Sequence, residues 1–374
     1  MDVDRRQVLA YRIARHGLHR TEPDASALAV FDLGLQDSQR DTALLALAAR
    51  LDGDVGPESL AGDDRLVLAW SLRGAPHFHR LADIPEVTKA LVPLDETDAL
   101  ARMLWQQKEL RETGMAATDV LFDTARAIRT AVTKPMTKGA VSTAITQALP
   151  PSFSRWCRGC DATHIYEQLM RVATLHAGVR LESDARIATL APLEKRGRIR
   201  TKPDPAAATT VVERYLRLNG PATQGDAAGF AGTAKSVVTR TWPDDLAEVR
   251  VEGRKAFLPE DCLPELENPP EPDLVRLLPP LDPFTQARDK AVLVPDKARQ
   301  KEVWRILGNP GVLIADGDIT GIWRTKGSGK KLEFTITAFD PLRPAAREAA
   351  EAEAARVATA RGFANFTIAW LPST

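Results

Sequence analysis

Three consecutive polar residues, Gln36, Asp37 and Ser38, stand between a short apolar run at 30–35 and a predicted helix. A glutamine amide can accept a hydrogen bond from water and donate another elsewhere, and a carboxylate can act as a base or stabilise positive charge. If the segment is extended, Gln36 and Ser38 point to one side and Asp37 to the other. If it is a turn, Asp37 shares the side of Gln36. A third interpretation is that Asp37 or Ser38 only caps the helix.

Cys157, Cys160 and His164 place three possible metal ligands within eight residues. Zinc would require a fourth ligand, and nothing in the sequence places the remaining cysteine, Cys262, near these three. We therefore favour a structural interpretation. The two cysteines are buried and pack the start of a helix capped by Asp161, and we predict no metal site.

Two of the side chains that could contact DNA, Arg73 and His77, lie at a predicted hairpin. Strand alternation places His77 and His79, which flank Phe78, on one face, where they could touch a phosphate or a damaged nucleotide. Alternatively the histidines are polar residues on an exposed hairpin, an interpretation that suits His79 better than His77.

Two further segments carry basic and hydroxyl side chains suited to phosphate and base-edge contact. One is a predicted helix at 233–241 that contains Lys235 and Arg240, and it could equally be packed inside the protein. The other is a glycine-containing hairpin tip whose alternative interpretation is a solvated turn. The candidate residues at and before this tip are Trp323, Arg324, Lys326, Lys330 and Lys331.

The charge of the chain is balanced overall but uneven locally. The sequence has 50 basic and 50 acidic residues, which argues against a strongly basic nucleic-acid binder. However, residues 195–202 carry five positive charges and no negative one, whereas residues 259–273 carry six acids and no base. Because phosphate contact depends on the local field, the basic segment keeps DNA binding open. Two solvated loops are the alternative.

Several protein classes are excluded by the absence of their motifs. The lysine-rich tip lacks the spacing of a nucleotide phosphate loop, and no glycine-rich dinucleotide fingerprint follows a strand. No apolar run is long enough for a membrane span, and the start of the chain lacks the apolar region of a signal peptide. We therefore expect a cytoplasmic monomer without a nucleotide or other cofactor.

Hydrophobic periodicity predicts one order of elements, helices followed by a β-hairpin, three times along the chain. The first group has helices at 4–16 and near 40–52 and strands at 66–72 and 77–80. The second has helices at 119–133, 138–148 and 161–177 and strands at 179–182 and 186–190. The third has a helix at 211–218, a short helix after Thr223 that ends at about 232 and a helix at 233–241, followed by strands at 246–251 and 255–258. This recurrence is typical of tandem winged-helix units. Thr223 is a predicted N-cap.

The remainder of the chain is predicted to be β-rich. Strands at 312–316, 319–325, 331–338 and 366–371 surround a helix at 345–361. The fold class is therefore α+β, with predicted domains at 1–92, 93–203, 204–273 and 274–374.

Four segments resemble a family of winged-helix DNA-binding proteins that includes the AlkZ/YcaQ-type bacterial DNA glycosylases. They lie, in the family's order, at 66–77, 213–223, 276–284 and 317–324. The resemblance implies three tandem winged helices followed by a C-terminal β-barrel-like domain, which together bind duplex DNA. It also implies a catalytic Gln-x-Gln or Gln-x-Asp motif. Gln36 matches the first position, whereas Ser38 departs from the second.

The resemblance implies a monofunctional DNA glycosylase that hydrolyses the N-glycosidic bond of alkylated or crosslinked bases with an activated water. Gln36 is the first catalytic candidate, and Asp37 and Ser38 follow. Because Ser38 breaks the motif, a non-catalytic DNA-binding protein or regulator is the alternative. A protein-interaction scaffold would be favoured if the surface proved neutral.

Overall fold

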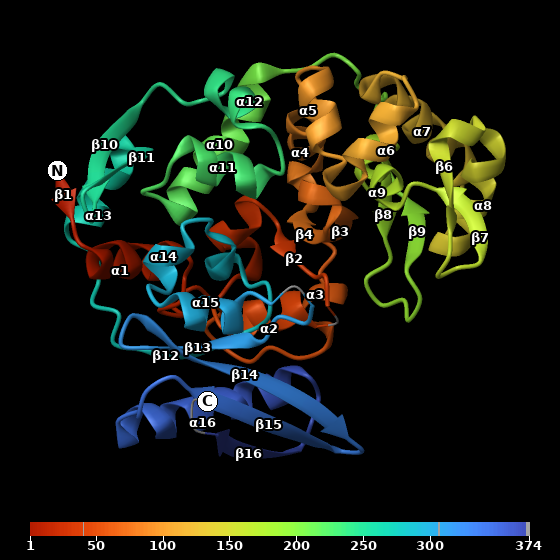
Figure 1. Ribbon diagram of the computed structural model, residues 1–374. Helices are drawn as coiled ribbons and strands as arrows, with labels where there is room; N and C mark the ends of the chain where they lie inside the picture. The colour runs from red at the N-terminus through yellow and green to blue at the C-terminus, as the bar shows by residue number, and fades with distance from the viewer. Residues whose placement is uncertain (40, 306, 372–374) are drawn as a thin grey trace. The chain divides into compact units, whose positions relative to one another are not determined.

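The computed structural model describes residues 1–39, 41–305 and 307–371, and it shows an α+β protein built from two compact units (Figure 1). Unit 1 comprises residues 1–63, 214–226 and 244–374, and unit 2 comprises residues 64–213 and 227–243. The predicted boundaries at 92 and 203 fall inside unit 2, and the predicted boundary at 273 falls inside unit 1. Residues 306 and 372–374 of the predicted C-terminal domain, and residue 40 of the predicted second helix, lie outside the described residues.

Unit 1 contains the first elements of the chain and all those of its C-terminal third. Its strands are β1 (Asp2–Val3), β2 (Leu35–Gln36), β10 (Leu246–Val251), β11 (Arg254–Pro259), β12 (Val275–Leu278), β13 (Gly311–Ala315), β14 (Asp318–Ser328), β15 (Lys331–Ala338) and β16 (Asn365–Leu371). Its α-helices are α1 (Arg5–Arg15), α2 (Thr42–Ala48), α3 (Glu58–Ala61), α13 (Leu263–Glu267), α14 (Lys290–Leu293), α15 (Lys297–Val303) and α16 (Pro344–Ala360). Its short 3₁₀ helices are η1 (Ala25–Ala27), η2 (Ala29–Asp32), η7 (Glu260–Cys262) and η8 (Pro283–Gln286).

Unit 2 contains the middle of the chain. Its strands are β3 (Leu66–Trp70), β4 (Pro76–Arg80), β5 (Met136–Thr137), β6 (Ser154–Cys157), β7 (Ala162–Ile165), β8 (Val179–Leu181) and β9 (Thr189–Pro192). Its helices are α4 (Ile84–Ala90), α5 (Glu96–Ala101), α6 (Gln107–Glu112), α7 (Ala117–Ala131), α8 (Lys138–Ala148), α9 (Glu167–His176) and α12 (Lys235–Arg240), with η3 (Leu72–Gly74), η4 (Leu81–Asp83), η5 (Leu104–Gln106) and η6 (Pro151–Phe153). Two helices, α10 (Pro205–Asn219) and α11 (Gln224–Ala231), have residues in both units.

The C-terminal strands form an open sheet in the order β12-β13-β14-β15-β16, drawn in blue in Figure 1. Neighbouring strands are antiparallel except β15 and β16, which are parallel and joined by α16. The predicted barrel-like closure is therefore wrong for the described strands, because β12 and β16 end the sheet without pairing to each other. Small residues four apart let α16 pack closely against β12, β16 and α2: Ala346, Ala350, Ala354 and Ala358.

Helix α1 begins after Asp4, whose carboxylate accepts the Gln7 N–H at 2.8 Å. Its apolar residues belong to two hydrophobic clusters of unit 1. Leu9 and Ile13 pack with the C-terminal sheet, and Val8 packs with the three-stranded sheet β1-β10-β11. This burial confirms the predicted amphipathic helix and explains its stability in the fold.

A fully buried ion pair joins the residues after α2 to the segment after β12. Arg50 Nη2 lies 2.6 Å from Asp282 Oδ1, and Arg50 Nη1 lies 2.8 Å from Asp282 Oδ2, so the pairing is bidentate. Arg50 also donates to the Ala46 carbonyl at 2.8 Å, and Asp282 accepts the Phe284 N–H at 2.9 Å. These bonds compensate part of the large cost of removing both charges from water.

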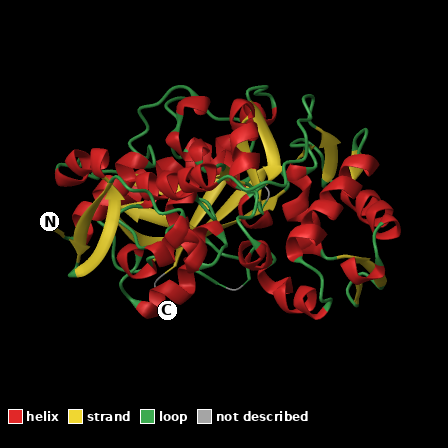
Figure 2. Ribbon diagram, turned by 90° about the horizontal axis from the view of Figure 1, so that it is seen from above, coloured by secondary structure: helices red, strands yellow, loops and turns green. Residues whose placement is uncertain are grey.

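Within unit 2, antiparallel strands lie in the order β4-β3-β8-β9-β5, and β6 and β7 form a separate hairpin. Helices α7, α8 and α9 and strands β8 and β9 confirm the predicted second group of elements, and α10, α11, α12, β10 and β11 confirm the third. Figure 2 shows this mixture of helices and strands. The predicted helix at 161–177 starts later, at Glu167, because residues 162–165 pair with β6 instead.

Thr223 caps α11, as the sequence predicts. Its Oγ1 accepts the Asp226 N–H at 3.2 Å, and the Asp226 carboxylate accepts the Thr223 N–H at 2.9 Å. This reciprocal pair satisfies two backbone donors at the start of the helix. Among the described residues, no helix combines the length and apolar character required to cross a bilayer.

Replacing Asp282 by alanine should lower the free energy of unfolding by about 3–5 kcal/mol, because the change leaves the Arg50 guanidinium buried without its counter-charge. Urea unfolding measures this loss. Glu271→Ala is the control, since Glu271 pairs with Arg6 in solvent, at exposures of 80% and 75%, and its loss should cost less than about 1 kcal/mol. Equal losses in the two variants would contradict the assigned importance of the buried pair.

Candidate functional site

Gln36 and Ser38 lie on the same side of the chain, where Gln36 ends β2 and Ser38 is exposed. Gln36 Nε2 donates a hydrogen bond to Ser38 Oγ at 2.7 Å. This contact agrees with the alternation predicted for an extended segment. It orients the amide, and the Ser38 hydroxyl keeps its own proton as a donor.

Asp37 faces the opposite way, toward the start of α2. Its Oδ1 accepts the Ala43 N–H at 3.0 Å and lies 3.3 Å from the Thr42 hydroxyl. Burial raises the pKa of Asp37 above the usual aspartate range, while the hydrogen bonds from Ala43 and Thr42 oppose that shift. The carboxylate therefore serves as a cap for α2, and the turn geometry that would place it beside Gln36 is not adopted.

The Thr42 hydroxyl holds the segment between β2 and α2 in place. It donates to the Gln39 carbonyl at 2.8 Å and lies 3.3 Å from the Gln36 carbonyl. Asp41, just before α2, has a positive φ of 67° and a carboxylate 3.7 Å from Arg361 Nε. Thr42, Asp41 and Arg361 are not among the predicted site residues, and no local sequence pattern indicates Arg361, which lies 320 positions beyond Asp41.

His77 and His79 are buried in β4, at 2% and 1% exposure, so neither forms an exposed hairpin surface. Their rings lie on one face, 5.9 Å apart, as predicted. His77 Nδ1 and His79 Nε2 approach the Ser71 hydroxyl at 3.0 and 2.8 Å. Burial and the neighbouring His79 hold the pKa of His77 well below its usual value. The ring of His77 is therefore enclosed, and the structure does not present it to solvent as the predicted DNA contact requires.

Arg73 is half-buried and bound within unit 2. Its guanidinium donates to the Phe230 carbonyl and lies over the Phe230 ring, 4.8 Å from the centroid. These contacts fix the turn between β3 and β4, where Arg73 has a φ of 59°. They support a structural role for Arg73.

Trp323 is a core residue of the C-terminal sheet, with 2% exposure. It pairs with Gly311 across β13 and β14, and a Cβ added at Gly311 would lie 2.3 Å from the indole ring. The indole N–H donates to the Leu278 carbonyl at 2.9 Å. The Trp323 ring therefore lies inside the sheet, where only glycine at position 311 leaves room for it, and its predicted support of the lysine-bearing tip stays a prediction.

The hairpin between β14 and β15 exposes the predicted lysines Lys326, Lys330 and Lys331. In the described part of the chain, none of the three forms an ion pair. Arg324, also exposed, donates to the Gly308 carbonyl at 2.6 Å. The tip therefore presents three lysine charges to solvent.

Helix α12 buries Val237 and Val238 and exposes its polar residues, so it is neither wholly enclosed nor wholly solvated. Lys235 is exposed at its first position. Arg240 lies 2.5 Å from Asp95, and both side chains are partly exposed. Lys235 is therefore exposed to solvent, as a DNA contact requires, whereas Arg240 is paired with the Asp95 carboxylate.

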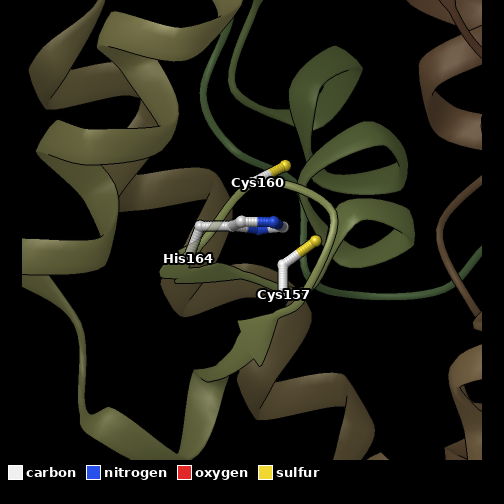
Figure 3. A group of neighbouring side chains, drawn as sticks. All are labelled: Cys157, Cys160 and His164. Carbon is white, nitrogen blue, oxygen red and sulfur yellow. The ribbon is translucent and has the colours of Figure 1, made fainter.

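Cys157, Cys160 and His164 lie together at the β6–β7 hairpin (Figure 3). Cys160 is exposed and Cys157 is half-buried, so the predicted buried pair at a helix start is wrong. Asp161 lies in the hairpin turn, with a φ of 51°. Hydrogen bonds from His164, Cys160 and the backbone lower the pKa of Cys157 to about 7.

Comparison with known proteins gives three concordant matches. The family model described as "DNA glycosylase AlkZ-like" matches residues 30–360. The "Interstrand DNA cross-link repair glycosylase" of Streptomyces sahachiroi is 32% identical over 178 residues, which span 44% of this chain and 46% of that protein. The solved structure of "Streptomyces sahachiroi DNA glycosylase AlkZ" superposes with a TM-score of 0.74 at 23% identity, covering 99% of this chain and 100% of the other. At this identity the structural match shows the shared fold.

Asp37→Ala should lower the free energy of unfolding by about 1 kcal/mol, because the start of α2 loses its cap. Asp37→Asn keeps an acceptor oxygen and should change the free energy of unfolding by less than about 0.5 kcal/mol at pH 7. The raised pKa means that folded Asp37 holds a proton more tightly than the unfolded chain does. Wild type should therefore gain stability relative to Asp37→Asn as the pH falls toward about 4. Urea unfolding across this pH range checks both effects, and equal losses in the two variants at pH 7 would contradict the capping role.

Proposed function

The chain belongs to the AlkZ-like DNA glycosylase family, and from this premise we propose that it hydrolyses the N-glycosidic bond of an alkylated or crosslinked base in duplex DNA. One observation carries the proposal. The Gln36 amide is held by the exposed Ser38 hydroxyl, at 2.7 Å, directly before α2. The protein would act as a monomer and without a nucleotide cofactor.

Hydrolysis of an N-glycosidic bond develops positive charge on the sugar, and a protein accelerates it by placing a water and acceptor groups beside that charge. In the proposed mechanism the bond from C1′ to the base nitrogen breaks, and the positively charged alkylated base leaves with the bonding electron pair. A water that donates a hydrogen bond to the Gln36 carbonyl oxygen adds to C1′ and releases its extra proton to solvent. The bond from Gln36 Nε2 to Ser38 sets the plane of the amide. The Ser38 hydroxyl then donates to the water or to the DNA backbone.

Asp37 contributes indirectly in this scheme. Its carboxylate caps α2 through Ala43 and Thr42, and this holds the backbone that carries Gln36. We therefore propose Asp37 as a positioning residue. This assignment differs from the expectation that Asp37 is itself a catalytic candidate.

The substrate class is suggested by the curated relative, whose name describes interstrand cross-link repair. The aligned region spans about half of that protein, so we extend only the class of reaction to this chain. An alkylated or crosslinked base is therefore the proposed substrate.

The tandem winged-helix organisation is part of the proposal. In the segment 93–203, helices α7, α8 and α9 precede the β8–β9 hairpin, and β9 pairs with both β5 and β8. This supports one winged helix, into which the β6–β7 hairpin is inserted between α8 and α9. Helices α10–α12 followed by the β10–β11 hairpin support another at 204–273. The first is proposed at 1–92, where helices α1 and α2 and the β3–β4 hairpin follow one another along the chain.

Exposed basic segments in each unit support binding to duplex DNA. In unit 1 these are the hairpin lysines Lys326, Lys330 and Lys331. In unit 2 the basic segment at 195–202 exposes Lys195, Arg198, Arg200 and Lys202, and Lys235 is exposed on α12. Arg196 is the exception, since its guanidinium donates to the Val132 carbonyl at 2.7 Å and to the Gly178 carbonyl at 3.1 Å.

A non-catalytic DNA-binding protein is the second candidate function, and one observation favours it. Ser38 replaces the glutamine or aspartate that the family motif carries at this position. A hydroxyl cannot act as a carboxylate base near neutral pH, so water activation would rest on Gln36.

Gln36→Ala should reduce base release from N7-alkylguanine duplex DNA by about 10²–10³-fold, because the group that positions the water is lost. Release is measured by alkaline strand cleavage at the abasic product, with duplex affinity measured in parallel. Gln39→Ala, which removes a neighbouring exposed glutamine, is the matched control and should retain activity. If wild type binds duplex DNA but releases no alkylated or crosslinked base, the non-catalytic function is the correct one.

Duplex affinity should fall steeply with salt, and the plot of log K against log salt should become less steep by about 0.9 for each phosphate contact removed. We expect this change when Lys326, Lys330 and Lys331 are replaced by alanine. Lys108→Ala is the control, because Lys108 lies 3.9 Å from Glu112 on an exposed helix face. An affinity that is insensitive to salt would contradict the proposed phosphate contacts.

A further inference from the structure

The β6–β7 hairpin brings three metal-ligating side chains together from one short segment (Figure 3). Arg155 pairs with His164 across the hairpin, and Cys157 lies two residues beyond Arg155 on the same strand. Because side chains two apart share a face and cross-strand pairs point the same way, Cys157 and His164 are diagonal neighbours on one face. The turn at 158–161 then returns Cys160 to that face.

The spacing of the ligand atoms fits a tetrahedral ion after a small movement. The two sulfur atoms and the His164 ring nitrogen all lie within 4.8 Å of one another. A Zn–S bond of about 2.3 Å requires two sulfurs about 3.8 Å apart in a tetrahedral site. The side chains therefore need to approach by about 1 Å at most, which a small side-chain rotation at an exposed turn supplies.

The surroundings prepare these side chains for a metal. His164 Nδ1 lies 2.7 Å from the Ile165 carbonyl oxygen. A carbonyl only accepts, so Nδ1 carries a proton. When a metal displaces any proton from Nε2, that nitrogen offers its lone pair, which is the arrangement found in metal-binding histidines. Both cysteines are free thiols, and a Cβ added at Gly159 would meet nothing within 4 Å, so the turn is open to solvent.

The base of the hairpin is anchored independently of any ion. The Ile165 N–H donates to Thr146 Oγ1 at 2.9 Å, and the Tyr166 N–H donates to the Phe153 carbonyl at 3.1 Å. The nearby Glu167 carboxylate is engaged by Lys138 at 2.6 Å and by Arg171 at 2.6 Å. Glu167 is therefore committed to these cations, which leaves solvent to complete a four-coordinate ion.

We propose that Cys157 Sγ, Cys160 Sγ and His164 Nε2 bind a zinc ion, with water in the fourth position. Two thiolates and an imidazole are the donor set that zinc prefers among abundant biological metals. Among the described residues, this is the single group of three such ligands. The ion ties the turn to β7 and stiffens the outer end of a hairpin whose base is already held by α8. The zinc site is formed by unit 2, whereas the Gln36–Ser38 segment belongs to unit 1, and the zinc proposal does not depend on the proposed glycosylase activity.

The test uses the full chain, purified with reducing agent, stripped with a chelator and then titrated with zinc. We expect one zinc per chain by elemental analysis, and cobalt substitution should produce thiolate-to-cobalt charge-transfer absorption in the near ultraviolet. Cys157→Ser, Cys160→Ser and His164→Ala should each weaken zinc binding, measured by competition with a chromophoric chelator, by about 100-fold or more. Limited proteolysis at 158–161 should slow when zinc is added to wild type.

Cys262→Ala is the matched control, because it removes the third cysteine, a buried residue of unit 1, and should leave zinc affinity unchanged. Circular dichroism of each variant shows whether it is folded before its affinity is compared. The proposal is overturned if folded wild type binds less than one zinc per chain under reducing conditions, or if the ligand variants bind as tightly as Cys262→Ala. It is also overturned if cobalt binds without thiolate charge-transfer bands.

Discussion

The buried ion pair between Arg50 and Asp282 is the interaction on which the position of the candidate site depends. Arg50 follows α2, and Asp282 follows β12, so the pair joins this helix to the C-terminal sheet within unit 1. Two charges removed from water tolerate little misplacement, because each loses its compensation when the other moves. The pair thereby fixes the end of α2, whose opposite end receives the Asp37 carboxylate.

The candidate site follows from that placement. With α2 held at both ends, the short segment before it has one well-defined path, and Thr42 reinforces it through the Gln39 carbonyl. Gln36 and Ser38 are then presented together, while Asp37 is used for the helix. Within one tripeptide, Asp37 thus caps the helix while Gln36 and Ser38 contact each other, and the fixed amide is the geometry that the proposed water-positioning role requires.

Much of the secondary structure could be predicted because it depends on local patterns. The alternation at 331–338 and the helical spacing at 138–148 coincide with β15 and α8 in the structure. The surroundings of individual site residues were harder to predict from the sequence. Trp323 stands close to several lysines in the sequence, as an aromatic residue of a binding surface can. In the structure its ring instead fills the space over Gly311, its cross-strand partner twelve positions earlier, and no local pattern identifies this pairing. His77 is also buried in the structure, where its Nδ1 lies 3.0 Å from the Ser71 hydroxyl.

Residue types, spacing and resemblance were enough to indicate the α+β class and the family, since these are properties of short segments. Tertiary packing settled which polar residues remain available. It buried His77, assigned Asp37 to a helix terminus, left the C-terminal sheet open, and turned Cys157, Cys160 and His164 from an expected buried pair into a solvent-facing cluster. Burial and strand pairing are set by partners that can lie anywhere in the chain, and for this reason local sequence could not specify them.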